Sequence, residues 1–246
     1  MFEIPRGVID PFTKALIGLD FDSLRMHCEF VKASLNDERE RFESYANKST
    51  KGLTKEQIAD FYQFHDSEVW QVSTLFPSFQ WMATFLLSYG MFEKALNDIC
   101  HNVGKLNDLP LTLQDISGQG IERAKLYLSK GCSVSAPFNS KEWAEVQRIS
   151  KIRNVIAHVS GLLDLDKNHH KEVFKIIQKD SAIIVNNHDV AQQTASIELT
   201  VEFNIKAIES FRSFLYLVCD TPRAGGTKSR AGLPNRSIRP RTRPSK

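Results

Sequence analysis

The chain has 246 residues, of which 41% are hydrophobic and 25% are charged, so its composition is that of a folded globular protein rather than a disordered or fibrous one. Its net charge of +3 hides an acidic body and a basic end, since the body without residues 221–246 carries a net charge of −5. The longest apolar run, residues 81–92, is too short to cross a membrane, the first ten residues do not resemble a signal peptide, and the four cysteines form no CxxC pair. We therefore expect a cytoplasmic protein with free thiols, no membrane association and no bound metal.

The first half of the chain predicts an irregular lead-in followed by long helices. Residues 1–20 contain Pro and Gly and read as irregular, and apolar residues at three- and four-residue steps predict a helix over 22–47. Thr54 followed by a glutamine three residues later forms a capping box and predicts a second helix over 55–75. A third helix over 78–103 is apolar on more than one side, so we expect it at the centre of a bundle.

The second half predicts shorter helices and one small hairpin. Helices are expected over 121–130, 143–163 and 168–179, the second of them starting at a capping box formed by Asn139 and Glu142. Two β-branched segments, 181–189 and 195–201, predict a two-stranded hairpin. A last helix covers 202–219. The expected fold is therefore all-α, an up-and-down bundle of about six or seven helices with a small β-hairpin before the last helix.

The final 26 residues, 221–246, contain six Arg, two Lys and four of the nine prolines but no acidic residue. Such a segment cannot bury enough apolar surface to fold, so we expect a helical domain over 1–220 and a disordered basic tail over 221–246. Its arginines Arg236, Arg239, Arg241 and Arg243 are candidates for phosphate contacts with nucleic acid, although a solvated terminus without a role has the same composition.

The stretch KIRNVIAHVSG, residues 151–161, places three polar residues beside an apolar stripe. On a helix, Ile149, Ile152 and Ile156 face the core. Ser150, Arg153, Asn154, Ala157, His158 and Gly161 share a second face. Three members of this face are small, which allows another helix to approach closely, and the other three are Arg153, Asn154 and His158.

These three residues suit the cleavage of an RNA phosphodiester. A histidine such as His158 can take the proton of the 2′-hydroxyl, because its pKa lies near neutral pH. A guanidinium such as Arg153 can meet the negative charge of the transition state, and Asn154 can orient the imidazole. This chemistry needs no metal or other cofactor.

The helical pattern and the motif RNVIAH resemble the HEPN superfamily, in which four to six residues separate an arginine from a histidine and the first of these residues is polar. The resemblance extends over residues 22–163. It implies a metal-independent endoribonuclease, with RNA as substrate and Arg153, Asn154 and His158 as catalytic residues. It also implies a homodimer through the motif helix, with Ser150, Ala157 and Gly161 at the interface. Many members are bacterial toxins or antiphage effectors, so an antitoxin or effector protein is a further expected partner.

Two other interpretations are compatible with these residues. The same face can belong to a non-catalytic HEPN-like module that dimerises or docks a partner, in which case Arg153 and His158 are sealed by apolar contacts. Alternatively, the protein binds nucleic acid through the tail, and deletion of residues 221–246 abolishes that binding. The paired histidines of NHHKE, residues 168–172, read as an exposed helix start rather than a metal site.

Overall fold

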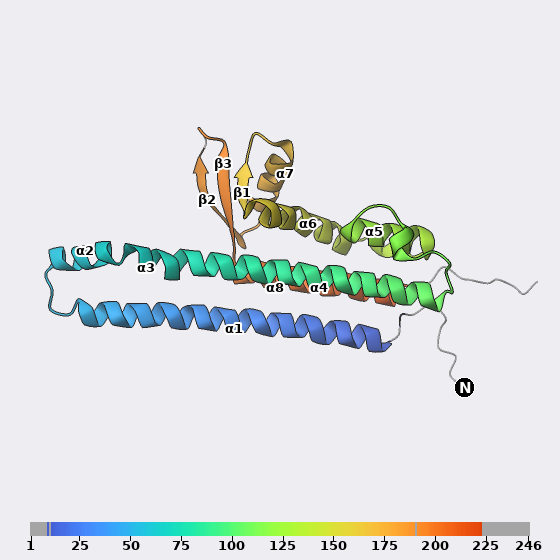
Figure 1. Cartoon of the computed structure of the whole chain (residues 1–246), viewed down its shortest axis with the longest axis horizontal. Coiled ribbons are helices and arrows are strands. Elements are labelled where there is room, and N and C mark those ends of the chain that lie inside the picture. Colours follow the sequence, from blue (N-terminus) through green and yellow to red (C-terminus); the bar gives the residue numbers. More distant parts are fainter. Residues whose placement is uncertain (1–8, 10, 190, 223–246) are drawn as a thin grey trace, which may run out of the picture.

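Three long helices run side by side, and the longest of them extends along most of the molecule (Figure 1). The computed structural model describes residue 9, residues 11–189 and residues 191–222, except for the side chains of residues 187 and 188. The long helices are α1 (Pro11–Ser49), α4 (Phe76–Leu106) and α8 (Val201–Asp220). None of the described helices is long and apolar enough to span a membrane. The expected mainly helical bundle with a small β insertion is confirmed.

The connection between α1 and α4 forms one end of the molecule. It contains α2 (Lys55–Phe64), α3 (Asp66–Trp70) and a π-helical turn, η1 (Gln71–Leu75). The predicted capping box is confirmed, because Thr54 Oγ1 accepts from Gln57 N–H at 3.3 Å and Gln57 Oε1 accepts from Thr54 N–H at 2.9 Å.

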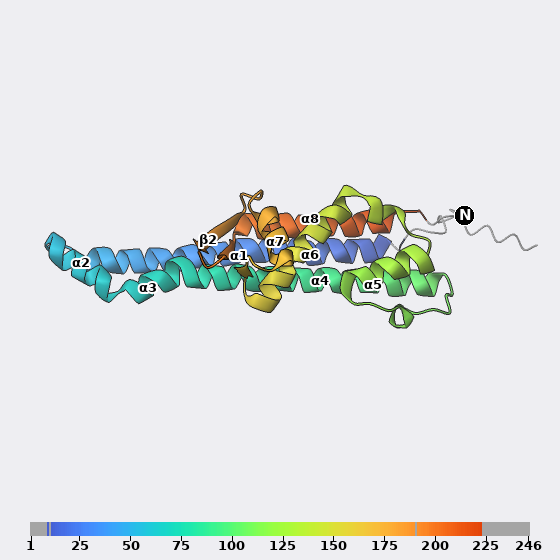
Figure 2. The same cartoon turned by 90° about the horizontal axis from the view of Figure 1, so that it is seen from above.

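A second layer lies on one side of the long helices (Figure 1, Figure 2). It starts with the short turns η2 (Leu113–Asp115), η3 (Tyr127–Gly131) and η4 (Ala136–Asn139) and the helix α5 (Gly120–Leu126). It continues with α6 (Lys141–Val159) and α7 (Asn168–Ile177), which precede and follow a short strand.

The sheet has one strand more than the sequence predicts. Its strands are β1 (Leu162–Asp164), β2 (Ile183–Asp189) and β3 (Thr194–Leu199), in the antiparallel order β1-β3-β2. The predicted hairpin is β2 and β3. The additional strand β1 pairs Leu163 with Ala195 and occupies residues that were expected to be helical.

The aromatic core lies between α4 and α8. Phe92 stacks on Phe211 with ring centroids 4.6 Å apart, and its ring meets Phe214 edge-on at 6.2 Å. All three side chains are fully buried, as expected for a chain whose aromatic residues are mostly phenylalanine. The central position predicted for the third helix is correct.

Three sequence-based boundaries are wrong for local reasons. The lead-in is shorter than expected, because α1 begins at Pro11, a residue suited to the first helical turn. The N-cap of α6 is Ser140 rather than Asn139, and its hydroxyl accepts from Trp143 N–H at 3.1 Å. The same helix ends at Val159, four residues before the predicted end at Leu163.

Candidate functional site

Helix α6 presents its apolar stripe to the core. Ile149, Ile152 and Ile156 are buried, whereas Asn154 and His158 are exposed. The periodicity of the sequence therefore assigns the two faces of this helix correctly. Because the isoleucines fix the helix to the bundle, they also fix the direction in which the polar residues point.

Most of the small residues expected at a dimer interface make contacts within their own chain instead. Ser150 Oγ lies 2.9 Å from the Tyr89 hydroxyl, and their hydrogen bond joins α6 to α4. Gly161 is buried beyond the end of the helix, and a Cβ at its position would lie 3.0 Å from the carbonyl oxygen of Ile197. Of the three small residues, Ala157 alone is exposed. The predicted close approach of a second motif helix therefore loses two of the residues on which it depended.

Two successive left-handed residues end α6. Ser160 has a φ of 50° and Gly161 a φ of 81°, and the Gly161 carbonyl accepts from Ile197 N–H at 3.1 Å. A glycine just past a helix end is favoured because it adopts this conformation without a Cβ clash. The chain then enters β1, which explains why the helical pattern of Leu163 does not continue the helix.

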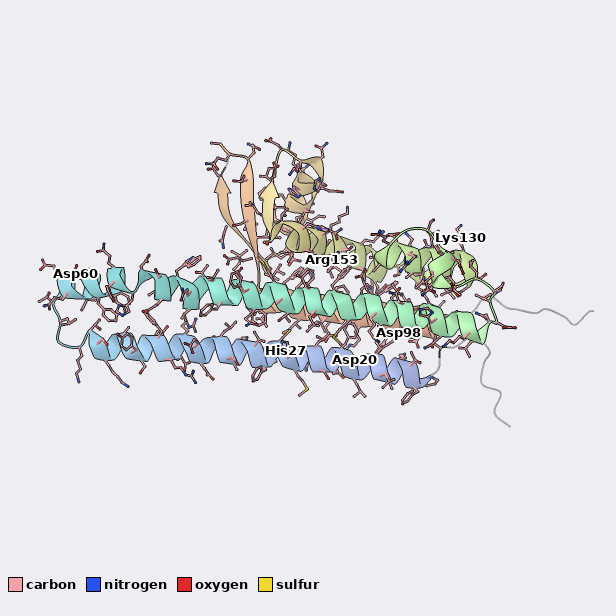
Figure 3. All side chains as sticks on the ribbon, in the orientation of Figure 1. Asp20, His27, Asp60, Asp98, Lys130 and Arg153 are labelled. Carbon is pink, nitrogen blue, oxygen red and sulfur yellow. The ribbon has the colours of Figure 1, made fainter. Side chains whose placement is uncertain are left out.

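Arg153 points from α6 towards α4 (Figure 3). Its guanidinium lies over the Tyr89 ring, 4.9 Å from the centroid, and its Nη2 is 3.8 Å from Glu93 Oε2. Its Nη1 donates to Asn154 Oδ1 at 3.2 Å. Arg153 is thus engaged by an aromatic face, a carboxylate and an amide, and its side chain is about one-third exposed at 32%.

Asn154 therefore bonds to Arg153, whereas the sequence predicted a bond to His158. Within the described residues, no hydrogen bond joins the Asn154 amide to the His158 ring. The amide instead connects the Arg153 guanidinium to the opening in which His158 lies. The three motif residues form a chain along the helix surface and do not converge on a single point.

A pocket of about 430 Å³ lies between α6 and α7. It collects basic and imidazole side chains from the two helices and the turn between them, and its polar lining residues are Lys151, Asn154, His158, Lys167, His169, His170 and Glu172. Two imidazoles from different helices, those of His158 and His169, share this opening and are both exposed. His158 lines this opening but Arg153 does not, so the two residues do not share the single open cleft that the catalytic interpretation expected.

The lysines of the pocket are held by weak surface ion pairs. Lys151 Nζ is 2.9 Å from Glu172 Oε1, and Lys167 Nζ is 3.1 Å from Asp164 Oδ2. All four side chains are more than 40% exposed, and such pairs contribute little to stability. Both ammonium groups can therefore turn towards an anion that enters the pocket.

His170 has a structural role at the floor of this region. It is buried, and its Nδ1 accepts the N–H of Asp164 at 2.9 Å. Burial, together with the nearby His169 and Lys167, lowers the pKa of His170 below its usual value. The ring is thus kept neutral, and it fixes the turn that positions Lys167 and His169.

The sequence missed His169, Lys151 and Lys167 as members of the site. The paired histidines at the start of α7 were the available signal, but they were interpreted as an exposed helix start. That interpretation is correct for His169 and wrong for His170. In the described part of the chain, no group of three His, Cys, Asp or Glu side chains is placed to hold a metal ion.

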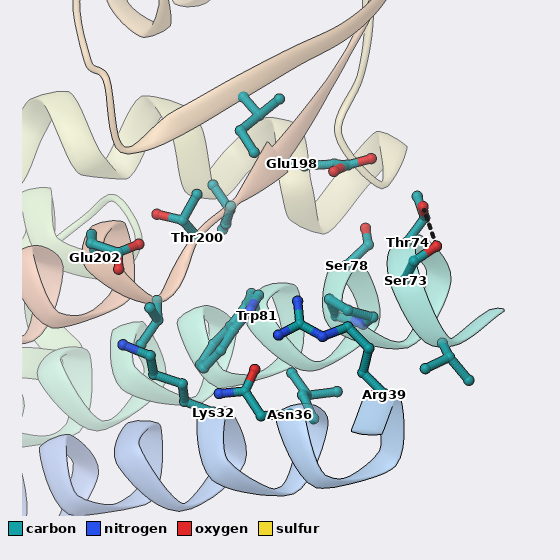
Figure 4. A pocket seen from close by; sticks show the side chains of 16 residues that line it. Lys32, Asn36, Arg39, Ser73, Thr74, Ser78, Trp81, Glu198, Thr200 and Glu202 are labelled. Carbon is teal, nitrogen blue, oxygen red and sulfur yellow. Dashed lines mark hydrogen bonds between the residues drawn. The ribbon is translucent and has the colours of Figure 1, made fainter. Parts of the chain in front are cut away.

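A second pocket, of about 350 Å³, lies where α1 and the start of α4 meet the turn between β3 and α8 (Figure 4). Lys32 and Arg39 enter it from α1, and Glu198 and Glu202 enter it from the opposite side. Its described lining contains no histidine or cysteine. The balanced charges and the lack of a group that transfers protons near neutral pH make it a weaker candidate for acid–base chemistry.

The predicted phosphate-binding arginines of the tail, Arg236, Arg239, Arg241 and Arg243, lie outside the described residues. All four cysteines are within them, and each is buried and takes part in no disulfide bond, as expected. Burial raises the pKa of Cys28 to about 11 and that of Cys219 to about 12, so these thiols are not nucleophiles near neutral pH. Histidine is instead the side chain whose usual pKa lies closest to neutral pH.

Comparison of the chain with protein-family models, with curated proteins and with solved structures gives no significant match, so the HEPN resemblance rests on the helical pattern and the RNVIAH motif alone.

Proposed function

We propose that the protein is a metal-independent endoribonuclease whose reaction takes place in the pocket between α6 and α7. One observation carries this proposal: His158 and His169 line the same pocket together with Lys151 and Lys167. A pair of imidazoles supplies a base and an acid near neutral pH, and two ammonium groups supply positive charge where a phosphate would lie.

The roles follow from the chemistry of RNA. His158 removes the proton of the 2′-hydroxyl, the 2′-oxygen attacks phosphorus, and the bond from phosphorus to the 5′-oxygen breaks. His169, in its protonated form, gives a proton to the departing 5′-oxygen. Lys151 and Lys167 balance the negative charge that grows on the phosphoryl oxygens. The products are a cyclic 2′,3′-phosphate and a free 5′-hydroxyl, and no further reactant is needed.

Arg153 is a positioning residue in this scheme rather than a phosphate ligand. Its guanidinium is engaged by Tyr89 and Glu93 and holds the Asn154 amide, and Asn154 lines the pocket beside His158. Removal of Arg153 is therefore expected to weaken cleavage through the placement of Asn154, by about tenfold, whereas loss of a proton-transfer group typically costs roughly a hundredfold or more.

The alternative function is a non-catalytic module that docks a partner on the same helix. The placement of Arg153 favours it, because an arginine engaged by an aromatic ring and a carboxylate has a sufficient structural role. In that case the open pocket receives a side chain of the partner and no bond is broken.

The test is cleavage of a mixed RNA substrate in EDTA by wild type, His158→Ala and His169→Ala. His101→Ala is the matched control, because His101 is an exposed histidine on α4 and lines a different opening. We expect cyclic-phosphate ends from wild type and from the control, and a loss of about a hundredfold in each pocket variant. Absence of cleavage by wild type, or equal cleavage by His158→Ala, refutes the proposal.

Two further measurements bear on the biological role. If the chain is a toxin or an antiphage effector that cleaves host RNA, its expression slows growth and expression of His158→Ala does not. If the tail supplies the RNA affinity, deletion of residues 221–246 abolishes binding at moderate salt, whereas His158→Ala leaves binding intact.

A further inference from the structure

Helix α1 carries apolar residues on two opposite faces. One face, with Phe21, Leu24 and Cys28 among its buried residues, packs against α4 and α8. The other face is exposed, on a helix that lies on the side of α4 opposite to the sheet (Figure 1). It contains Leu16, Leu19, Met26 and Phe30, which are 45%, 64%, 72% and 69% exposed. These four residues are called the α1 stripe.

The spacing of the α1 stripe is that of a helix that packs against another helix. Leu16, Leu19, Ser23, Met26 and Phe30 follow one another at steps of three, four, three and four residues, the a and d positions of a heptad. Ser23 is the small polar member, and its hydroxyl donates to the Leu19 carbonyl at 2.8 Å, so it needs no partner from outside. Single exposed apolar residues are common, but a continuous row of them marks an interaction surface.

We propose that the α1 stripe is the contact surface of a homodimer, in which the α1 helices of two copies cross antiparallel about a two-fold axis. The order of the residues is self-complementary. Reversal of the helix about residue 21 places Leu16 opposite Met26 of the second copy and Leu19 opposite Ser23, so that a large side chain meets a small one at the centre. A two-fold contact requires this kind of self-matching surface.

The size of the surface fits a dimer. At about 200 Å² for each large side chain, the exposed fractions of the four residues amount to roughly 500 Å² per copy. Leu87 lies on α4, one turn before Met91, which lines the groove beside α1. It is 52% exposed and adds about 100 Å². Two copies therefore remove about 1,200 Å² from water, the lower end of the range for specific protein interfaces.

The charges at the border favour a second copy over a strongly basic partner. Asp22 Oδ1 is 2.7 Å from Arg212 Nη1. The carboxylate of Asp20 contributes, after the larger effect of Asp98, to the raised pKa of Lys94. Asp22 is thus paired within its own chain and Asp20 interacts with the charge of Lys94, so neither carboxylate depends on a cation from a partner.

The test is the mass of the full-length protein in solution, measured by sedimentation equilibrium or by light scattering during gel filtration. We expect wild type at micromolar concentrations to have twice the chain mass of 28.0 kDa. The double variant Leu19→Glu/Met26→Glu should have the mass of one chain, with the dissociation constant of the dimer raised at least about a hundredfold. Both substituted residues are exposed, so circular dichroism and thermal unfolding should report an intact monomer.

The control is Phe64→Glu, because Phe64 is an apolar residue on α2, 85% exposed and far along the molecule from the α1 stripe (Figure 1). It should remain dimeric. Since the contact is mainly apolar, the wild-type dimer should persist at 1 M NaCl, where exposed ion pairs are screened. A monomeric wild type, or a double variant that still dimerises, overturns the proposal, and dissociation of the dimer at high salt does so as well.

Discussion

Substitution of Gly161 by alanine tests whether this residue ends helix α6 or belongs to a surface for a second copy. Its φ of 81° lies in the left-handed region, and an added Cβ would meet three atoms at short range. These atoms are the carbonyl oxygen of Ile197 at 3.0 Å, Ile197 Cγ1 at 3.1 Å and Met82 Cε at 3.2 Å. The Met82 side chain is flexible, but the Ile197 carbonyl belongs to the central strand β3 and cannot move without disturbing the sheet.

The expected loss of stability follows from two contributions. A left-handed conformation costs a residue with a Cβ about 1–2 kcal/mol, and an extra methyl group in a tightly packed place costs about 1–3 kcal/mol. Alanine restricts the unfolded chain more than glycine does, which offsets roughly 0.5 kcal/mol. We therefore expect Gly161→Ala to lower the free energy of unfolding by about 2–4 kcal/mol.

The assay is equilibrium unfolding in urea, with the slope m and the midpoint fitted separately, at two protein concentrations tenfold apart. Gly90→Ala is the matched control. Gly90 is an exposed residue within α4, and a Cβ there meets nothing within 4 Å. The same chemical change should therefore stabilise the protein by about 0.5–1 kcal/mol, because alanine is the better helix former.

An unchanged midpoint for Gly161→Ala would refute this reasoning. A loss of stability that disappears at high protein concentration would instead assign Gly161 to an interface. A loss of the same size at both concentrations, together with the opposite sign for Gly90→Ala, would establish a role within the chain.

Three further predictions concern polar groups around α6. Asp180 is buried, and its carboxylate lies 2.9 Å from both Arg148 and Lys206; Asp180→Ala should destabilise by about 3 kcal/mol in urea unfolding, the low end for a broken buried pair, because Arg148 keeps a second partner. His170 has a lowered pKa when folded, so the unfolded chain binds more protons below about pH 6.5 and stability should fall from there towards the lowered pKa. His170→Gln should remove that part of the pH dependence in thermal melts between pH 8 and pH 5, and an identical pH profile would contradict the buried neutral ring. Tyr89→Phe removes the hydrogen bond to Ser150 but keeps the ring, so it should cost about 1 kcal/mol in the same urea assay.

Asp180 is a second cause of the expected loss of folding stability at low pH. Burial alone would raise the pKa of this carboxyl, but the bonds from Lys206 and the Ala182 N–H and the charge of Arg148 outweigh burial and hold the pKa below its usual value. Its contribution is therefore present above the unfolded pKa of about 4 and is lost as the pH falls further. The loss that comes from His170 thus begins near pH 6.5, whereas the loss that comes from Asp180 begins only near pH 4.

The local elements of this fold could be predicted from the sequence because their causes are local. Apolar residues at three- and four-residue steps predict which face of α6 is buried, and a capping box at Thr54 predicts where α2 begins. Both signals depend only on residues within a few positions of each other. The spacing of the α1 stripe is also a local signal. Its exposure could not be predicted, because a buried face of a helix has the same spacing.

Packing between different helices determines which residues belong to the candidate site. His169 and Lys167 share the pocket with His158 because α7 packs beside α6, and the neutral ring of His170 fixes the turn that brings them there. Arg153 was expected at the reacting phosphate, yet Tyr89 and Glu93, more than 50 residues earlier in the sequence, engage it on α4.

The end of α6 shows how a tertiary contact overrides a local sequence signal. The helical spacing of the sequence continues through Leu163, but strand β3 offers hydrogen bonds to Gly161 and Leu163 from residues 195–197. The sequence by itself determined which side chains prefer the core and which are able to exchange protons. Only the tertiary structure decided which of them meet, because packing energy comes from surfaces that no local pattern brings together.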